Sequence, residues 1–172
     1  MHKIIIAAKK FATERHAAID HRRKYTGEPY IVHPAEVAEM VTEYGGTKEM
    51  IAASWMHDTL EDTNTKYAEI AVDFGLLIAS FVLWLTDEKP FGMNRAQRQA
   101  LNNERLGQSP VGVKTIKLAD SIKNMESIAK HDPKFAITYF DEKSYLLPHL
   151  KGGDERLYKI MRDMIRDFDN KN

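Results

Sequence analysis

Apolar residues recur at helical spacing in nearly every segment longer than ten residues, and almost no segment shows the two-residue alternation of a strand. This pattern predicts an all-α bundle of about eight to ten helices. Pro34 suits the first turn of a helix. Gly45 and Gly46 suit the end of that helix, and Thr47 suits the N-cap of the next one. The predicted helices cover residues 3–19, 34–44, 48–60, 66–73, 76–87, 95–106, 110–130, 133–147 and 155–168.

The length of the chain, 172 residues, suits one domain with a substantial core, and no linker-like segment, internal repeat or low-complexity stretch divides it. We therefore expect a single domain over residues 1–172. The longest uncharged run, residues 74–86, is shorter than the roughly 20 residues that span a bilayer. The apolar stretch near the N-terminus, residues 4–8, is short for a secretory signal. These features predict a cytoplasmic protein with no membrane partner.

The charge balance argues against long nucleic acids as partners. Lys plus Arg and Asp plus Glu both number 25, so the chain has no broad basic field. Basic residues do cluster locally, at positions 22–24 and at Arg95, Arg98 and Arg105, and such clusters suit a small polyphosphate. The chain has no cysteine, so any metal ion must be held by nitrogen and oxygen donors. The sequence does not indicate an oligomeric state.

One heptapeptide, residues 57–63, places an imidazole and three carboxylates close together. On a continuous helix, His57 stands over Glu61 and Asp58 over Asp62, because residues four apart share a face. His57 and Asp58 are residues of types that bind metal ions, and Glu61 and Asp62 are of types that suit general acid/base work. The alternative is an ordinary solvated helix end, which is the usual role of an acidic pair.

Two further residues extend this set to an H…HD…D series. His33 precedes a proline, and a histidine in that position commonly caps or packs when it stands alone. Asp120 ends the mostly apolar run 113–119, where burial requires a partner that offsets its desolvation. A shared metal ion satisfies both residues, whereas the alternative is a salt-bridged helical core.

Three segments, residues 23–34, 57–63 and 117–125, resemble in order and spacing the hydrolase domain of Rel/Spo-type enzymes, within the HD superfamily of metal-dependent phosphohydrolases. The resemblance implies one divalent ion, expected to be Mn2+. It implies that Glu61 and Asp62 manage protons. It further implies that Arg23, Lys24 and Asn124 bind the nucleotide substrate, and that the metal ligands are His33, His57, Asp58 and Asp120.

The implied reaction is hydrolysis of guanosine 3′,5′-bis(diphosphate) and its pentaphosphate relative at the 3′ position, which releases pyrophosphate and GDP or GTP. The chain resembles the short stand-alone hydrolases, so we expect it not to synthesise the alarmone. Residues 121–123 depart from the family pattern and leave the base preference open. The alternatives are a related phosphohydrolase acting on the NADPH 2′-phosphate or on adenine alarmones, and a non-catalytic nucleotide sensor. Five further residues are weaker candidates for the site, because surface packing explains each of them well enough: Lys117, Arg95, Arg98, Tyr139 and Lys143.

Overall fold

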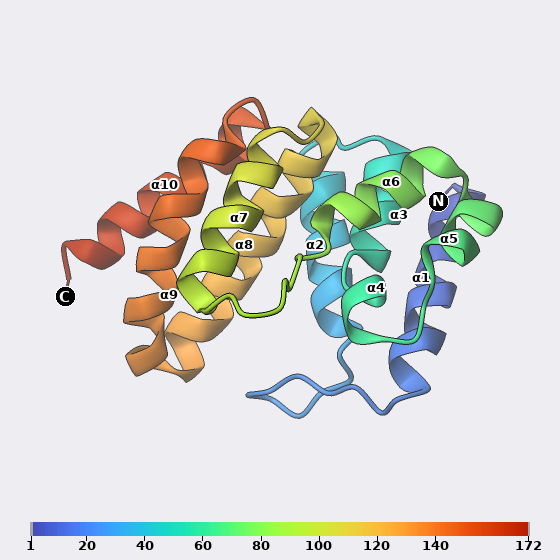
Figure 1. The fold of residues 1–172 in the computed structure, drawn as a ribbon, viewed down its shortest axis with the longest axis horizontal. Coiled ribbons are helices and arrows are strands. Elements are labelled where there is room, and N and C mark those ends of the chain that lie inside the picture. Colours follow the sequence, from blue (N-terminus) through green and yellow to red (C-terminus); the bar gives the residue numbers. More distant parts are fainter. Residues whose placement is uncertain (1, 172) are drawn as a thin grey trace. The chain divides into compact units, whose positions relative to one another are not determined.

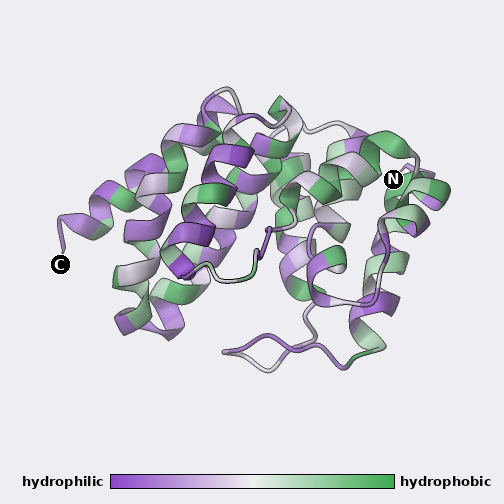
Figure 2. Ribbon diagram, in the orientation of Figure 1, coloured by the Kyte–Doolittle hydropathy of each residue, from purple (hydrophilic) through white to green (hydrophobic). Residues whose placement is uncertain are grey.

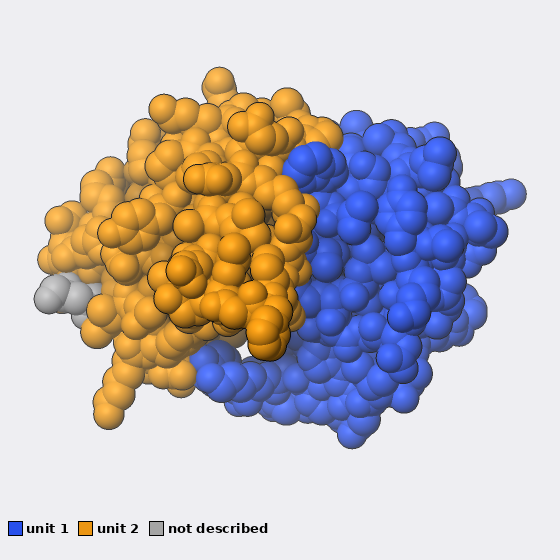
Figure 3. Space-filling view, in the orientation of Figure 1, with its two compact units in different colours: residues 1–86 blue, residues 87–172 orange. Residues whose placement is uncertain are grey.

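A computed structural model describes residues 2–171 of the protein. Within that range the regular structure is helical, and the nearest approach to a strand is an isolated bridge between Arg22 and Pro29 (Figure 1). The all-α prediction is confirmed. The chain divides into two compact units, residues 1–86 and 87–172 (Figure 3). Two such units are compatible with one domain or two, so the single domain predicted for residues 1–172 stays a prediction.

In unit 1 the third helix is the centre of the core. All residues from Ile51 to Met56 are buried, and this helix contacts the first, second and sixth helices. The sixth helix is apolar on nearly every side and is drawn mostly green in Figure 2. The helices of the described part of unit 1 are α1 (Lys3–Ala17), α2 (Val32–Glu43), α3 (Lys48–Met56), α4 (Thr59–Asp62), α5 (Tyr67–Phe74) and α6 (Leu76–Leu85).

The turn between α2 and α3 forms as the sequence predicts. Gly45 adopts a positive φ of 80°, which ends α2, and the Thr47 hydroxyl accepts a hydrogen bond from the Met50 N–H at 3.3 Å. The start of α2 differs from the prediction, because the helix begins at Val32 and Pro34 lies inside its first turn. Proline is tolerated there, since the first N–H groups of a helix have no intrahelical acceptor.

In unit 2 the long helix α8 occupies the corresponding central place and contacts the other helices of the unit. Its buried residues include Ile116, Ile122 and Met125, all fully enclosed, together with the polar Asp120. None of the described helices combines the length and apolar character needed to cross a bilayer. The described helices of unit 2 are α7 (Arg95–Gly107), α8 (Val111–His131), α9 (Pro133–Leu146), the 3-10 helix η1 (Leu147–Leu150) and α10 (Glu155–Asp169).

Candidate metal centre

Three of the predicted metal ligands meet in unit 1. Donor atoms of His33, His57 and Asp58 all lie within 4.8 Å of one another. Among residues 2–171, these three side chains form a group that could hold a metal ion. Both histidines are buried, and Asp58 is half-buried. Two imidazoles and a carboxylate form a donor set that suits a divalent transition ion. The residues therefore fit the metal that the sequence predicts.

The two ring nitrogens of His57 have different roles. Nδ1 lies 2.8 Å from the Ser54 carbonyl oxygen, which only accepts hydrogen bonds, so Nδ1 carries the proton. In the neutral ring Nε2 is then an acceptor, and it lies 2.9 Å from Asp58 Oδ2. Two acceptors at this distance require a positive charge, either a proton on Nε2 or a cation bound by both atoms. This arrangement is what a metal-ligating histidine needs.

His33 comes from the first turn of α2. Its ring is buried and packs edge-on against the His57 ring, with centroids 5.2 Å apart and planes at 70°. The His33 N–H donates to the Tyr30 carbonyl at 3.0 Å, which fixes where α2 begins. Two separate helix ends thus bring the imidazoles together.

The helix that carries His57 ends earlier than the sequence predicts. We expected one helix through residue 60, whereas α3 ends at Met56 and the four-residue helix α4 follows. The His57 imidazole donates to the Ser54 carbonyl, and the Thr59 hydroxyl donates to the Met56 carbonyl at 2.7 Å. A continuing helix would offer these two carbonyls to backbone N–H groups, so the side chains compete with it and the helix opens at residues 57–58.

The two acidic residues predicted for acid/base work lie on α4. Glu61 is half-buried and Asp62 is exposed. The Asp62 N–H donates to the Asp58 carbonyl at 2.9 Å, which is the hydrogen bond of a helical turn. Asp58 and Asp62 therefore remain one helical turn apart, as predicted, although the helix breaks at residues 57–58. Both carboxylates therefore follow the metal-type residues by about one turn. Their catalytic role stays a prediction.

Asp120 and Asn124 lie in unit 2, on α8. Asp120 is only 5% exposed, and the Lys117 ammonium lies 2.9 Å from its Oδ2. The Asn124 amide donates to Asp120 Oδ1 at 2.7 Å. Asp120 thus has the partners that its burial requires. Its predicted place among the metal ligands, and the predicted nucleotide contact of Asn124, stay predictions.

Lys117 belongs to a cluster of half-buried ionisable side chains with Tyr139 and Lys143. Burial lowers the pKa of Lys117, but the charges of Asp120 and Asp87 outweigh burial and hold that pKa above its usual range. Burial raises the pKa of Tyr139, and the charge of Asp120 acts in the same direction. Burial and the charge of Lys117 lower the pKa of Lys143 to about 8. Charge pairing within unit 2 therefore explains Lys117, which the sequence left undecided.

Arg23 and Lys24 lie on the loop between α1 and α2, residues 18–31, which we call the α1–α2 loop. The loop folds back on itself: the Arg23 N–H donates to the Glu28 carbonyl at 2.8 Å, and Gly27 takes a positive φ of 71°. Lys24 is exposed, and its ammonium lies 4.8 Å from the centre of the Tyr25 ring. The two basic residues thus stand on an ordered turn.

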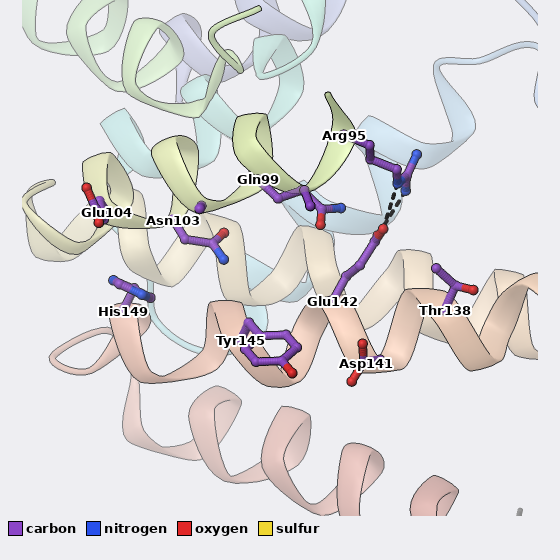
Figure 4. Close-up of a pocket in the computed structure, with 11 residues that line it drawn as sticks. Arg95, Gln99, Asn103, Glu104, Thr138, Asp141, Glu142, Tyr145 and His149 are labelled. Atoms are coloured by element: carbon purple, nitrogen blue, oxygen red, sulfur yellow. Dashed lines mark hydrogen bonds and ion pairs between the residues drawn. The ribbon is translucent and has the colours of Figure 1, made fainter. Parts of the chain in front are cut away.

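The other basic residues considered from the sequence are engaged within unit 2. Arg95 forms a bidentate pair with Glu142, at 2.6 and 2.9 Å, across a groove of about 560 Å³ between α7 and α9 (Figure 4). Arg98 donates to the Met93 carbonyl at 2.6 Å. These contacts support the structural explanation of both arginines.

The structure adds residues that sequence reasoning missed. The Tyr30 hydroxyl donates to Asp58 Oδ2 at 2.5 Å. The Tyr30 ring stacks on His21, with centroids 3.8 Å apart, and His21 contacts the buried His16. Burial lowers the pKa of His16 to about 4, although the charge of Asp58 opposes this shift. No spacing in the sequence marks these three residues, because the α1–α2 loop brings them together.

The HD domain family matches residues 8–145, so the chain belongs to that family. The human guanosine-3′,5′-bis(diphosphate) 3′-pyrophosphohydrolase MESH1 is 28% identical over 169 residues, which are 94% of this chain and 93% of that protein. The Danio rerio protein of the same name is 30% identical over 169 residues, with 94% and 92% covered.

One further relative is much longer than this chain, and one solved structure is similar at lower sequence identity. An Aquifex aeolicus guanosine-3′,5′-bis(diphosphate) 3′-pyrophosphohydrolase is 39% identical over 125 residues, 70% of this chain but 17% of that protein. A solved structure of a metazoan ortholog of SpoT, described as hydrolysing ppGpp, is similar with a TM-score of 0.87 at 22% identity. It covers 97% of this chain and 96% of that chain, and it supports the fold.

Proposed function

We propose that the protein is a metal-dependent hydrolase of guanosine 3′,5′-bis(diphosphate) and its pentaphosphate relative. Water attacks the phosphorus esterified to the 3′ oxygen and the bond between these two atoms breaks. The water oxygen becomes part of the pyrophosphate, and the nucleotide departs as GDP or GTP with a protonated 3′ hydroxyl. The observation that carries the proposal is the convergence of His33, His57 and Asp58 in a member of the HD domain family. Relatives that match this chain over more than nine-tenths of both lengths are named for this reaction.

The metal proposal specifies one divalent ion, Mn2+, held by His33, His57 and Asp58. The geometry supports it, because His57 Nε2 and Asp58 Oδ2 lie 2.9 Å apart and a cation bound by both atoms satisfies them together. Such an ion supplies Lewis-acid chemistry, which polarises a phosphate and makes a nucleophile available at neutral pH. We include Asp120 as the fourth ligand because the sequence motif that carries it is present.

Proton transfer is assigned to Glu61 and Asp62. Attack of water on phosphorus releases a proton, and the departing 3′ oxygen must gain one. A carboxylate one turn from the metal-type residues suits both tasks, since it accepts the first proton and returns it to the leaving group. Glu61 is the stronger candidate of the two, because it is half-buried whereas Asp62 is exposed.

Substrate binding is assigned to Arg23, Lys24 and Asn124. The two basic side chains neutralise phosphate charge, and Arg23 offers a planar fork of donors for it. The Asn124 amide is held by its bond to Asp120, so its oxygen is oriented to accept from a nucleotide donor.

The reaction is tested by incubating chelator-stripped protein with guanosine 3′,5′-bis(diphosphate), with and without Mn2+, and separating the products by anion exchange. The expected result is GDP and pyrophosphate that form only with the metal. Untouched guanosine substrate, together with hydrolysis of NADPH or of an adenine alarmone, would replace the substrate assignment. Tight binding without turnover of any of these nucleotides would indicate a sensor.

Replacement of Glu61 by alanine tests the acid/base role. We expect Glu61→Ala to lower kcat by about 10²- to 10⁴-fold, the usual contribution of a positioned acid or base, and to leave Mn2+ binding unchanged. Steady-state kinetics and Mn2+ titration measure the two effects. Asp58→Ala should lose both metal and activity, whereas the exposed Asp73→Asn should lose neither. An unchanged rate in Glu61→Ala would assign the role elsewhere.

A further inference from the structure

The carboxylate of Asp58 is held by a residue outside the metal group. Tyr30 Oη donates to Oδ2 at 2.5 Å, and the same oxygen lies 2.9 Å from His57 Nε2. A hydrogen bond to an ionised carboxylate is shorter and stronger than a neutral one. Because Tyr30 belongs to the α1–α2 loop and Asp58 to the N-cap of α4, this bond fixes the rotation of the carboxylate from a separate element.

The ring of Tyr30 is itself fixed from two sides. It lies parallel to the His21 ring, 3.8 Å away with planes 8° apart, and it packs at 4.9 Å against the His16 ring. The Tyr30 N–H also donates to the His21 carbonyl at 2.9 Å. The hydroxyl therefore has little freedom to leave Asp58 by rotation of the ring.

His21 takes its orientation from His16. The two Nδ1 atoms lie 3.0 Å apart, so one ring donates and the other accepts. His16 is 1% exposed and lies on the last turn of α1, and burial keeps its ring neutral at pH 7 because its pKa is about 4. A neutral pair with complementary tautomers holds one geometry. A pocket of about 150 Å³ adjoins all three aromatic residues.

We propose that Tyr30 is a positioning residue for Asp58, and that His16 and His21 act on the metal only through the plane of the Tyr30 ring. This proposal rests on the proposed function, because it takes Asp58 to be a metal ligand. It assigns to the α1–α2 loop a second role beside carrying Arg23 and Lys24. Residues that orient metal ligands commonly change metal affinity by about 10- to 100-fold when they are replaced.

The test is Mn2+ titration of chelator-stripped Tyr30→Phe, which keeps the ring and removes the hydroxyl. We expect Mn2+ to bind about tenfold more weakly, with a melting temperature close to that of the wild type. At saturating Mn2+ the KM for nucleotide should be unchanged. Tyr67→Phe is the matched control, since Tyr67 lies on α5 in the same unit and outside the site. A purely structural role would instead lower the melting temperature and leave the Mn2+ affinity of the folded protein unchanged.

A double-mutant cycle tests whether His21 acts on the metal through Tyr30. His21→Leu removes the stacking ring and should weaken Mn2+ binding by several-fold, but it should add nothing in the Tyr30→Phe background, because the hydroxyl through which it acts is gone. If the effects of the two substitutions on Mn2+ affinity added, His21 would not act through Tyr30, and that part of the proposal would be wrong. Should Tyr30→Phe fail to fold, His21→Leu alone decides, and unchanged Mn2+ affinity in it rejects the proposal.

The failure of this proposal is distinguishable from the failure of the proposed function. Mn2+ affinity within twofold of the wild type in Tyr30→Phe, with loss of binding in Asp58→Ala, rejects the positioning role and keeps the metal site. Full Mn2+ affinity in Asp58→Ala rejects the metal site itself, and the positioning role with it.

Discussion

At the scale of single residues, the ionisation of the buried His16 ties the stability of unit 1 to pH. His16 has a folded-state pKa of about 4 because burial penalises its charged form, whereas an exposed histidine titrates near 6.5. Between these pH values the unfolded chain binds a proton that the folded chain does not. The contribution of His16 to stability is therefore complete above about pH 6.5 and is lost as the pH falls toward 4.

We predict that His16→Gln reduces the loss of stability between pH 6.5 and pH 4. The wild type should lose on the order of 3 kcal/mol more of its free energy of unfolding between pH 7 and pH 4 than the variant does. Urea unfolding at a series of pH values measures the difference. The exposed His131→Gln is the control and should retain the wild-type slope. Equal slopes in His16→Gln and the wild type would show that His16 is not held neutral by burial.

At the scale of elements, the break between α3 and α4 decides where His57 and Asp58 lie. Hydrophobic spacing continues smoothly from residue 48 to residue 60, and it predicts a single helix. The break arises from the donors on His57 and Thr59, which compete with backbone N–H groups for the carbonyls of Ser54 and Met56. The spacing of hydrophobic residues indicates which side chains are buried, but it does not indicate which side chains bind backbone carbonyls. The sequence therefore could not locate the break.

Removal of the Thr59 hydroxyl tests the role of the break. Thr59→Val keeps the shape of the side chain, and we expect it to cost about 1 kcal/mol of stability and to weaken Mn2+ binding by several-fold. Chemical denaturation and Mn2+ titration measure the two effects. Thr86→Val is the matched control, because the Thr86 hydroxyl also donates to a backbone carbonyl, that of Val82, at the end of α6. It should cost similar stability and leave Mn2+ binding intact.

Most other elements were predictable because their ends carry explicit signals. Asn94 accepts from the Gln97 N–H at the start of α7, and Asp132 accepts from the Phe135 N–H at the start of α9. Both helices therefore begin where the sequence indicates. In the site, His33, His57 and Asp58 were predictable from motif spacing. Tyr30 was not, because its role depends on how the α1–α2 loop closes.

At the scale of the whole molecule, metal binding and folding are linked. An ion that binds only the folded chain raises the free energy of unfolding by about 2.7 kcal/mol at a hundredfold excess over its dissociation constant. We predict that Mn2+ raises the melting temperature of the chelator-stripped protein and that a chelator reverses this rise. Thermal unfolding followed by circular dichroism measures the shift. Asp58→Ala should show none, and a shift of wild-type size in that variant would place the ion elsewhere.

Under the proposed binding of phosphate by Arg23 and Lys24, the folded state of the α1–α2 loop has a kinetic consequence. A disordered basic arm loses conformational entropy each time it closes on its ligand, whereas this loop is already folded by its bridge between Arg22 and Pro29. Capture is then governed by diffusional encounter between opposite charges. Its association rate falls as ionic strength rises and increases in proportion to nucleotide concentration, without the plateau that a slow closing step imposes.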